Sequence, residues 1–333
     1  MITQHFSLKN YNTFGIDVET EFFALITDEK ALFETLKSNG DKPFRVLGGG
    51  SNVLLTQDYK GLTLVMKNKG ISILKETKNH VIIEVQAGEN WHDLVLWTLE
   101  KDFGGIENLA LIPGSVGAAP IQNIGAYGVE LSTVFHRCKV LDLERLSFQE
   151  FDKNDCEFGY RSSIFKSQLK GKTIITRVQL KLSKQPHQSH THYGNLQSTL
   201  KGKEKTIQNI AAAVIAIRKS KLPDPAQIGN SGSFFKNPVI PTNQFTKLQE
   251  NYPEIPHYPD TLERVKIPAG WLIEKLGYKG KRFGDAGVHD KQALVLVNHG
   301  NAKGKELLAL AREIQAQVLQ HFYIKLEIEV NIL

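Results

Sequence analysis

The amino-acid sequence predicts an α+β protein, and two observations support this fold class. Between residues 44 and 88 the sequence reads as short β segments, and the gaps between them are too short for helices. Parallel strands joined by helices need crossovers of about a dozen or more residues, so these gaps favour antiparallel pairing. Helical patterns lie before and after this run. The β segments, in order, are FRVLG, NVLLT, LTLVM, ISILKE and VIIEVQAG.

The other elements follow in chain order. A helix is predicted over residues 29–39, because Asp28 can cap its first turn and Gly40 can end it. The polar segment 183–205 reads as a loop that leads toward a new unit. The remaining expected elements are a helix near residues 90–101, strands near 137–143 and 173–182, and a helix over 206–222 that is ended by Pro223 and Pro225.

The chain is expected to finish with a helix and a strand. Apolar residues recur there at three- and four-residue steps and define one face of a helix. The stretch IKLEIEV then alternates in polarity, which places Glu327 and Glu329 on the same face of a predicted strand. The apolar face of the helix consists of Leu307, Ala311, Ile314, Val318 and Phe322.

The composition limits the classes of function. The chain of 333 residues is 41% hydrophobic and 23% charged, which is typical of a folded protein with two or three domains. A net charge of +6 is compatible with nucleic acid, but the basic residues are scattered and no recognition motif accompanies them. A phosphorylated small molecule accounts for the same excess of positive charge. We therefore expect small-molecule partners and no nucleic acid.

Location and redox state are inferred from features that the sequence lacks. No apolar run approaches the ~20 residues that a membrane-spanning helix needs. The start MITQHFSLKN has no pattern of a secretion signal, so we expect a cytoplasmic protein without membrane insertion. Cys138 and Cys156 are spaced neither as a redox pair nor as zinc ligands, and we interpret both as reduced and structural.

A glycine loop is the first candidate for ligand binding. Gly48, Gly49 and Gly50 precede Ser51 and Asn52 between two predicted strands, where backbone N–H groups can approach a phosphate closely. An ordinary nicotinamide-binding fold would need a helix directly after the glycines, and VLLT reads as a strand instead. A tight turn without any ligand explains the same residues, since glycine is the usual turn residue.

The second candidate is the segment over residues 106–128, in which glycines alternate with alanines and Pro113 and Pro120 fix turns. Such a density of small residues lets the backbone lie flat against a large planar or phosphate-bearing ligand. The alternative is a close-packed loop beneath a sheet, because small residues also mark tight packing.

Eight motifs together resemble the UDP-N-acetylenolpyruvoylglucosamine reductase family. The resemblance extends over nearly the whole chain, from residue 11 to residue 330, and several of its motifs are long. The loop around Tyr193 and Gly194 resembles the longer of the two forms of the family. The motifs are YNTFGI, GGGSN, ENLALIPGSVGAAPIQNIGAYG, FGYRSSIF, KLPDP, GNSGSFFKNP, AGWLIE and EIEV.

The resemblance implies an FAD-binding part of the vanillyl-alcohol-oxidase type, with subdomains over residues 1–68 and 69–204, and an α+β substrate-binding domain over residues 205–333. FAD pyrophosphate would lie along the glycine loop and the isoalloxazine ring along residues 113–128. We expect noncovalent FAD, because the glycine loop has no histidine to tether it. The implied cofactor-binding residues are Gly48, Gly49, Gly50, Ser51, Asn52, Pro113, Gly114, Ser115, Gly117, Ala118, Gln122, Asn123, Gly125, Ala126, Tyr127 and Gly128.

The resemblance also implies the reaction, which is NADPH-dependent reduction of UDP-N-acetylglucosamine enolpyruvate to UDP-N-acetylmuramate in peptidoglycan precursor synthesis. Arg161 and Glu329 match the residues that stabilise charge on the carboxylate side of the substrate, and a guanidinium can bond a carboxylate through two N–H groups. Ser233 matches the proton donor. We expect a monomer. The implied residues for the diphosphate and uridine are Tyr193, Lys221, Asn237 and Gln292. Lys221 lies beside Arg218 and Lys219, and the three form a compact cationic patch suited to phosphate.

Plainer explanations apply to several of these residues. Arg161 could form a structural salt bridge, the serines and glycines around Ser233 could form only a turn, and Lys221 could be a favourable charge at a helix C-terminus. Three histidines also lie close together and could coordinate a transition metal. No acidic residue or cysteine joins them, so we expect no metal. These histidines are His187, His190 and His192.

Two other functions are considered. An oxidase on the same FAD fold would use oxygen or another electron partner, but the resemblance extends through the substrate-binding part. A sugar-nucleotide sensor that kept the fold would be expected to lose Arg161, Ser233 or Glu329, and all three are present.

Overall fold

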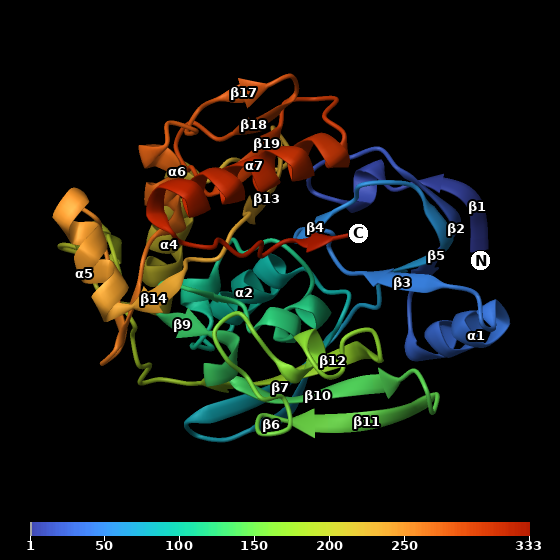
Figure 1. The fold of residues 1–333 in the computed structure, drawn as a ribbon. Coiled ribbons are helices and arrows are strands. Elements are labelled where there is room, and N and C mark those ends of the chain that lie inside the picture. The colour runs from blue at the N-terminus through green and yellow to red at the C-terminus, as the bar shows by residue number, and fades with distance from the viewer. Residues whose placement is uncertain (1) are drawn as a thin grey trace. The chain divides into compact units, whose positions relative to one another are not determined.

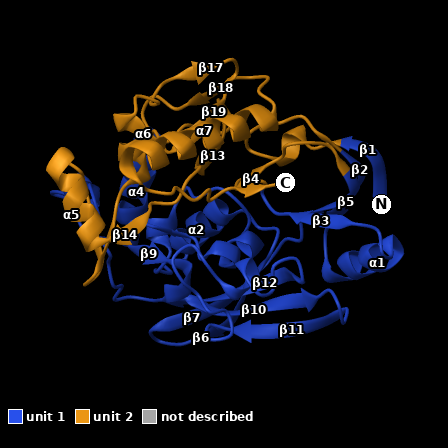
Figure 2. Ribbon diagram, in the orientation of Figure 1, with its two compact units in different colours: residues 1–6, 20–49, 60–220 blue, residues 7–19, 50–59, 221–333 orange. Residues whose placement is uncertain are grey.

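The structure is a computed structural model that describes residues 2–333, and its mixture of helices and sheets confirms the predicted α+β class (Figure 1). The chain divides into two compact units (Figure 2). The first unit comprises residues 1–6, 20–49 and 60–220, and the second comprises residues 7–19, 50–59 and 221–333. The three expected domains stay a prediction. Across the described residues, no helix combines the length and the apolar character needed to cross a membrane.

The first unit contains a four-stranded sheet in the order β1-β2-β5-β3, with helix α1 (Glu29–Asn39) packed on it through Leu32 and Leu36. Its strands β3 and β5 are parallel, so the expected antiparallel pairing is wrong for these two segments. The chain leaves the sheet after β3 through the glycine loop, and this excursion acts as the crossover that parallel strands need. The strands are β1 (Ile2–Ser7), β2 (Glu19–Ile26), β3 (Phe44–Leu47) and β5 (Tyr59–Met66).

A five-stranded antiparallel sheet, in the order β11-β10-β12-β7-β6, forms the larger part of the first unit. Antiparallel pairing of β6 with β7 confirms the prediction for those segments. Val81, Ile83 and Val85 alternate along β7 and are buried in a core that α2 (Trp91–Glu100) and α4 (Ile207–Lys221) share. The strands are β6 (Ile71–Glu76), β7 (His80–Gln86), β10 (Phe135–Asp142), β11 (Ser147–Asp152) and β12 (Thr173–Ser183).

The helix boundaries follow the capping chemistry of the sequence. The side chain of Asp28 accepts a hydrogen bond from the Ala31 N–H at 2.7 Å, and Gly40 ends α1 with a φ of 57°. Asn90 caps α2 by accepting from the N–H groups of His92 and Asp93. These helices, together with α4, confirm the predictions for their segments. Two shorter elements of this unit are α3 (Leu196–Thr199) and the hairpin of β8 (Gly125–Ala126) with β9 (Val129–Glu130).

The second unit is built around a sheet in the order β13-β19-β18-β17, and α7 (Gly304–Phe322) packs against β18 and β19. All five apolar residues predicted for the face of this helix are buried. A smaller sheet, β14-β16-β15, accompanies α5 (Thr242–Asn251), and α6 (Ala269–Lys275) packs against α7. The strands are β13 (Gly229–Ser233), β14 (Val239–Pro241), β15 (Tyr258–Thr261), β16 (Arg264–Lys266), β17 (Arg282–Phe283), β18 (Ala286–Val288) and β19 (Val295–Asn298).

The predicted terminal strand over IKLEIEV is wrong as a regular strand. Residues 324–327 alternate in burial, but within residues 324–330 only Ile328 forms a β-bridge, with Phe235. Regular pairing begins directly after Val330, where β20 (Asn331–Ile332) lies parallel to β4 (Val53–Leu54). Only two residues of each strand pair, so local alternation was not sufficient to locate this strand.

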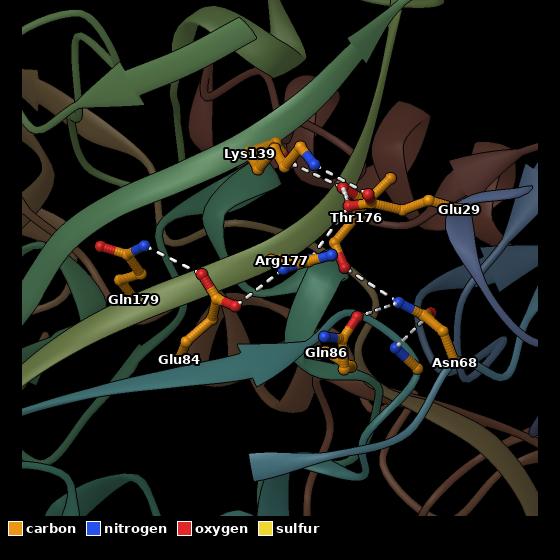
Figure 3. A network of polar contacts seen from close by, with 9 residues as sticks. Glu29, Asn68, Glu84, Gln86, Lys139, Thr176, Arg177 and Gln179 are labelled. Atoms are coloured by element: carbon orange, nitrogen blue, oxygen red, sulfur yellow. Dashed lines mark hydrogen bonds and ion pairs between the residues drawn. The ribbon is translucent and has the colours of Figure 1, made fainter. Parts of the chain in front are cut away.

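A polar network joins α1 to the five-stranded sheet (Figure 3). Glu29, in the first turn of α1, accepts from Lys139 at 2.7 Å, from the hydroxyl of Thr176 at 2.9 Å and from Arg177 at 3.0 Å. Arg177 also donates to Glu84 at 3.0 Å. Burial by itself would raise the pKa of Glu29, but these hydrogen bonds and positive charges outweigh it and hold that pKa below its ordinary value.

We predict that Glu29→Gln lowers the free energy of unfolding at pH 7 by ~1–3 kcal/mol, because half-buried Lys139 loses its charge partner and Arg177 loses one of two. A lowered folded-state pKa means that the charge contributes fully at pH values above the ordinary carboxyl pKa of about 4.3. The contribution then disappears as the pH falls through the folded-state value. Urea unfolding of both proteins between pH 7 and pH 3 measures this difference.

The matched control is Glu34→Gln on the same helix, where Glu34 is 3.9 Å from Lys30 and its side chain is 65% exposed. We expect this control to change the free energy of unfolding by less than about 0.5 kcal/mol. A loss for Glu29→Gln that is equally large at pH 3 and pH 7 would contradict the electrostatic role of Glu29.

Candidate active site

Two glycine-rich segments meet within the first unit. A Cβ atom added at Gly49 would lie 2.8 Å from the Cα of Gly114, and one added at Gly48 would overlap the side chain of Ser115. A Cβ added at Gly117 would lie 2.5 Å from the Cβ of Ala87. Backbone can approach backbone this closely only where side chains are absent. The structure therefore brings together two segments that the sequence indicated separately.

The first turn of α2 and the residues before it hold the segment over residues 109–117. The buried indole of Trp91 donates to the carbonyl of Leu109 at 3.0 Å, and the backbone N–H of Trp91 donates to the carbonyl of Gly114 at 3.0 Å. Two further backbone hydrogen bonds, each of 2.9 Å, run from Val116 to Glu89 and from Gly117 to Ala87. We name these contacts the α2 clamp. The α2 clamp therefore fixes the path of the backbone through the first half of the predicted ligand segment, residues 106–128.

The β8–β9 hairpin carries the rest of that segment. Tyr127, with a φ of 49°, and Gly128 form its turn. The side-chain amide of Asn108 donates to the Tyr127 carbonyl at 3.0 Å, while the buried Oδ1 of Asn108 has no hydrogen-bond partner among residues 2–333. Asn123 donates to the carboxylate of Glu130 at 2.8 Å. The hairpin is therefore held from both sides, and one buried acceptor beside it is available to a ligand.

Arg161 lies beside this hairpin. Its guanidinium donates to the carbonyl of Gly125 at 2.8 Å, and its φ of 52° is in the left-handed region. This conformation is uncommon for residues other than glycine and is concentrated at functional positions. The Arg161 carbonyl accepts from Lys166 at 3.3 Å. The bond to Gly125 holds the guanidinium at the hairpin, and the bond from Lys166 holds the Arg161 backbone.

Arg218 is a second cation at the same place, and the sequence indicated it only as part of the cationic patch around Lys221. The Nε of Arg218 is inaccessible to solvent and has no hydrogen-bond partner among the described residues. Burial lowers the pKa of Arg218, the Tyr127 side chain opposes that effect, and the positive charge of Arg161 adds to it. Two neighbouring guanidinium groups of this kind favour an anionic ligand. The sequence signal was the position of Arg218 on α4, directly after buried Ile217.

Tyr193 reaches the hairpin from the polar loop after β12. Its Cβ lies 3.5 Å from the position that a Cβ would take at Gly128, and its ring meets that of Tyr127 edge to face at 6.5 Å between centroids. Burial raises the pKa of the Tyr127 phenol, so this hydroxyl is neutral over the physiological range. Arg161, Arg218, Tyr127 and Tyr193 thus form one cluster in the first unit.

Ser233 and Glu329 lie close together in the second unit. The N–H of Glu329 donates at 2.9 Å to the carbonyl of Phe234, the residue after Ser233. The N–H of Lys236 donates at 2.9 Å to the carbonyl of Glu327, and Lys236 Nζ pairs with the Glu327 carboxylate at 2.8 Å. Glu327 is therefore the partner of Lys236. The predicted convergence of Arg161 with Ser233 and Glu329 joins residues of the two units and stays a prediction.

Other predicted site residues also have defined local roles. Gly50, with a φ of 63°, approaches the carbonyl of Tyr11 so closely that a Cβ would overlap it. The amide of Asn52 donates to the Glu329 carbonyl at 3.5 Å. The Oδ1 of Asn237 accepts from the Ala269 N–H at 2.9 Å at the start of α6. Lys221 is exposed at the end of α4, and Gln292 lies against Gly270.

His187 belongs to a different set of contacts from the other two histidines of its loop. It lies 2.9 Å from the Ser183 hydroxyl and 3.3 Å from the Asp102 carboxylate. The carbonyl of His190 accepts from Asn108 at 2.7 Å. No group of three or more histidine, cysteine or acidic side chains in the described part of the chain could hold a metal ion.

Comparison with known proteins adds two family matches. The sequence model described as UDP-N-acetylenolpyruvoylglucosamine reductase, C-terminal domain, matches residues 224–333, and the one described as FAD binding domain matches residues 21–144. A protein of Flavobacterium johnsoniae named UDP-N-acetylenolpyruvoylglucosamine reductase is 49% identical, over 100% of this chain and 99% of its own length. A protein of the same name from Pseudomonas putida is 46% identical, over 98% of this chain and 97% of its own length.

A solved structure is similar over the whole chain. The UDP-N-acetylenolpyruvylglucosamine reductase from Thermus caldophilus covers 100% of this chain and 98% of its own, with a TM-score of 0.69 and 24% sequence identity. At this identity the likeness supports the fold.

We predict that Gly49→Ala destabilises the first unit, because the new methyl group would lie 2.8 Å from the Gly114 backbone and would force the two segments apart. A loss of ~1–3 kcal/mol in the free energy of unfolding is expected for such overpacking. The control is Gly159→Ala, where a Cβ would meet the Ser162 Cβ at 3.8 Å, an ordinary contact. Thermal unfolding of both variants tests this, and equal stability of the two would contradict the close approach.

Proposed function

Because the chain belongs to the UDP-N-acetylenolpyruvoylglucosamine reductase family, we propose that it reduces UDP-N-acetylglucosamine enolpyruvate to UDP-N-acetylmuramate, with NADPH as the electron source, in peptidoglycan precursor synthesis. Membership of this family makes the chain an FAD-dependent oxidoreductase. The observation that carries the proposal is the match to relatives over nearly the full length of both chains. The shared part includes the C-terminal domain of this family as well as the FAD-binding domain.

The residues present fit FAD. Gly48 and Gly49 leave the backbone of the glycine loop without side chains, so its N–H groups can approach a pyrophosphate. Asn108 Oδ1 and Arg218 Nε are buried polar atoms without partners among the described residues, and a bound ligand can satisfy such atoms. When bound, FAD supplies the hydride-transfer chemistry that protein side chains lack. We infer noncovalent binding, because residues 48–52 include no histidine.

Positive charge is the main contribution of the first unit to the proposed reaction. Hydride addition to the enolpyruvyl group places negative charge on its carboxylate side. Arg161 offers a planar guanidinium that can bond a carboxylate through two N–H groups, and Arg218 adds a second positive charge nearby. Cations held in place before the reaction stabilise developing charge without a cost of reorganisation, which is often the largest catalytic effect.

Proton delivery is the proposed role of Ser233. A serine hydroxyl is a weak acid, so it must lie within hydrogen-bonding reach of the carbon and be polarised by its neighbours. Glu329 is a candidate neighbour, because its backbone is bonded to that of Phe234. Lys236 follows Ser233 closely along the chain, but its ammonium group is paired with Glu327. We assign Arg161 and Glu329 to the stabilisation of the substrate's developing negative charge. In this role the carboxyl group of Glu329 must carry a proton, so that it donates a hydrogen bond to the substrate.

Binding of the nucleotide portion is assigned to four residues that the sequence indicated. Lys221 is an exposed cation at the end of α4, where an ammonium group can meet a diphosphate, and Tyr193 stands 55% exposed against the hairpin. Asn237 and Gln292 would contribute amide groups to the uridine or diphosphate. NADPH also carries a diphosphate, so these residues would serve both nucleotides in turn.

We predict that Ser233→Ala leaves bleaching of the flavin by NADPH within about twofold of the parent but slows its recovery on addition of the enolpyruvyl sugar by at least ~100-fold. Stopped-flow absorbance at the flavin band measures the two half-reactions separately. Ser233→Cys retains an acidic proton, with an ordinary pKa of about 8.5, and should recover part of the second half-reaction.

Ser147→Ala, an exposed serine on β11, is the control and should match the parent in both half-reactions. Equal losses of Ser233→Ala in both half-reactions would remove Ser233 from proton delivery. If the parent protein binds FAD and is bleached by NADPH but the enolpyruvyl sugar never restores the flavin band, the proposed substrate is wrong.

We predict opposite effects of Arg218→Met on stability and on ligand binding. In the ligand-free protein the change removes a half-buried cation beside Arg161, so the free energy of unfolding should be unchanged or rise by ~1 kcal/mol. Affinity for the enolpyruvyl sugar should fall by about 10–100-fold, because one of two positive charges is lost. Thermal unfolding and calorimetric titration measure the two effects. A destabilised variant with parental affinity would show that Arg218 has only a structural role.

A further inference from the structure

One residue of the α2 clamp region can change its charge near neutral pH. His92 follows Trp91 in the first turn of α2, and its Nδ1 accepts a hydrogen bond from the Leu111 N–H at 3.0 Å. The contacts of the α2 clamp itself involve backbone groups and an indole, none of which titrates between pH 5 and pH 8. The connection between α2 and Leu111 is therefore the part of this region that acid can break.

The residue that His92 holds has an unfavourable backbone conformation. Leu111 has a φ of 59°, in the left-handed region that a bulky side chain rarely adopts. Such a conformation is energetically unfavourable and persists only where neighbouring contacts impose it. The hydrogen bond to His92 is a contact of that kind, because it fixes the direction of the Leu111 N–H.

The direction of the chain at Leu111 decides where the following residues lie. Ile112 and Pro113 lead directly to Gly114, whose carbonyl is held by Trp91 and whose Cα faces Gly49. Pro113 has a fixed φ, which leaves fewer dihedral angles between Leu111 and Gly114 to absorb a change at Leu111. The contact between the two glycine segments therefore depends on the conformation of Leu111.

We infer that His92 is a positioning residue, whose neutral imidazole holds Leu111 in its left-handed conformation and so places residues 113–117 for the flavin. The inference deepens the proposed function and rests on FAD binding along this segment. The hydrogen bond requires a lone pair on Nδ1, so the proton of the neutral ring is on Nε2. An imidazolium ion carries protons on both nitrogens and would turn a donor toward the Leu111 N–H.

The surroundings of His92 favour the neutral form. Burial lowers the pKa of His92, and the positive charges of Lys219 and Arg218 on α4 lower it further, while Asp93 on the same helix raises it. The result is a pKa below the ordinary value for histidine. Because the functional form is the unprotonated one, affinity for FAD should be full above that pKa and should fall as the pH drops through it.

The experiment compares three variants by titrating the apoprotein with FAD between pH 5 and pH 8 and following flavin fluorescence. His92→Leu removes the acceptor, whereas His92→Asn places an amide oxygen where Nδ1 stands. His80→Gln is the control, because His80 is exposed on β7 and its backbone, not its ring, makes the contacts with Thr77. Circular dichroism establishes that each variant is folded.

We expect the FAD affinity of the parent and of His80→Gln to fall as the pH drops through the His92 pKa, by up to about tenfold once the imidazole is protonated, as one hydrogen bond is lost. His92→Leu should bind about tenfold more weakly than the parent at pH 8, with no fall toward pH 5. His92→Asn should bind like the parent at pH 8 and also stay constant, because an amide does not titrate. A residue that only stabilised the fold would produce neither the flat pH profile nor the rescue by asparagine.

The inference is overturned if His92→Leu keeps both the affinity and the pH profile of the parent, or if His92→Asn binds as weakly as His92→Leu at pH 8. If His92→Leu does not fold, the comparison of His92→Asn with the parent decides, since a pH-dependent His92→Asn would exclude His92 as the titrating group. Absence of FAD binding by the parent would instead contradict the proposed function.

Discussion

Direct contact between two stretches of backbone, at Gly49 and Gly114, is the constraint on which the rest of the first unit's site depends. Because no side chain separates the two stretches, each fixes the position of the other. The α2 clamp then holds the second stretch against the start of a buried helix. The β8–β9 hairpin follows directly along the chain, and Arg161 is bonded to it through Gly125. The proposed FAD-binding surface consists largely of backbone, so it has few side chains of its own to pack and depends on these neighbouring contacts.

The first unit contains two groups of cationic side chains, one paired with carboxylates and one not. Around Glu29, Lys139 and Arg177 are paired with carboxylates, so the network is neutralised and joins α1 to the sheet. At the hairpin, Arg161 and Arg218 are neighbours, and the Nε of Arg218 has no partner among residues 2–333. The first arrangement contributes to stability in the absence of any ligand. The second leaves positive charge for an anion, which is consistent with a family whose substrate carries a carboxylate and a diphosphate.

Much of the fold could be predicted from local chemistry, and the failures have a common cause. The limits of α1 and the buried face of α7 followed from a capping aspartate, a terminating glycine and helical spacing. The parallel pairing of β3 with β5 was missed, because short gaps between strands were assumed to be turns within one sheet. Those segments in fact belong to three different sheets. Strand partners depend on long-range contacts, which a local pattern does not record.

For the candidate site, the sequence by itself determined the residue types and the motifs, including both glycine segments, Arg161, Ser233 and Glu329, and through them the family. Their spacing along the chain identified them because long motifs are specific. The tertiary structure alone decided which of these residues are neighbours within each unit, placed Arg218 beside Arg161, and added His92. The sequence indicated Arg218 only as part of a cationic patch around Lys221, and a histidine in the first turn of a helix is ordinary. Their roles arise from burial and from partners far along the chain, and these exist only once the chain has folded.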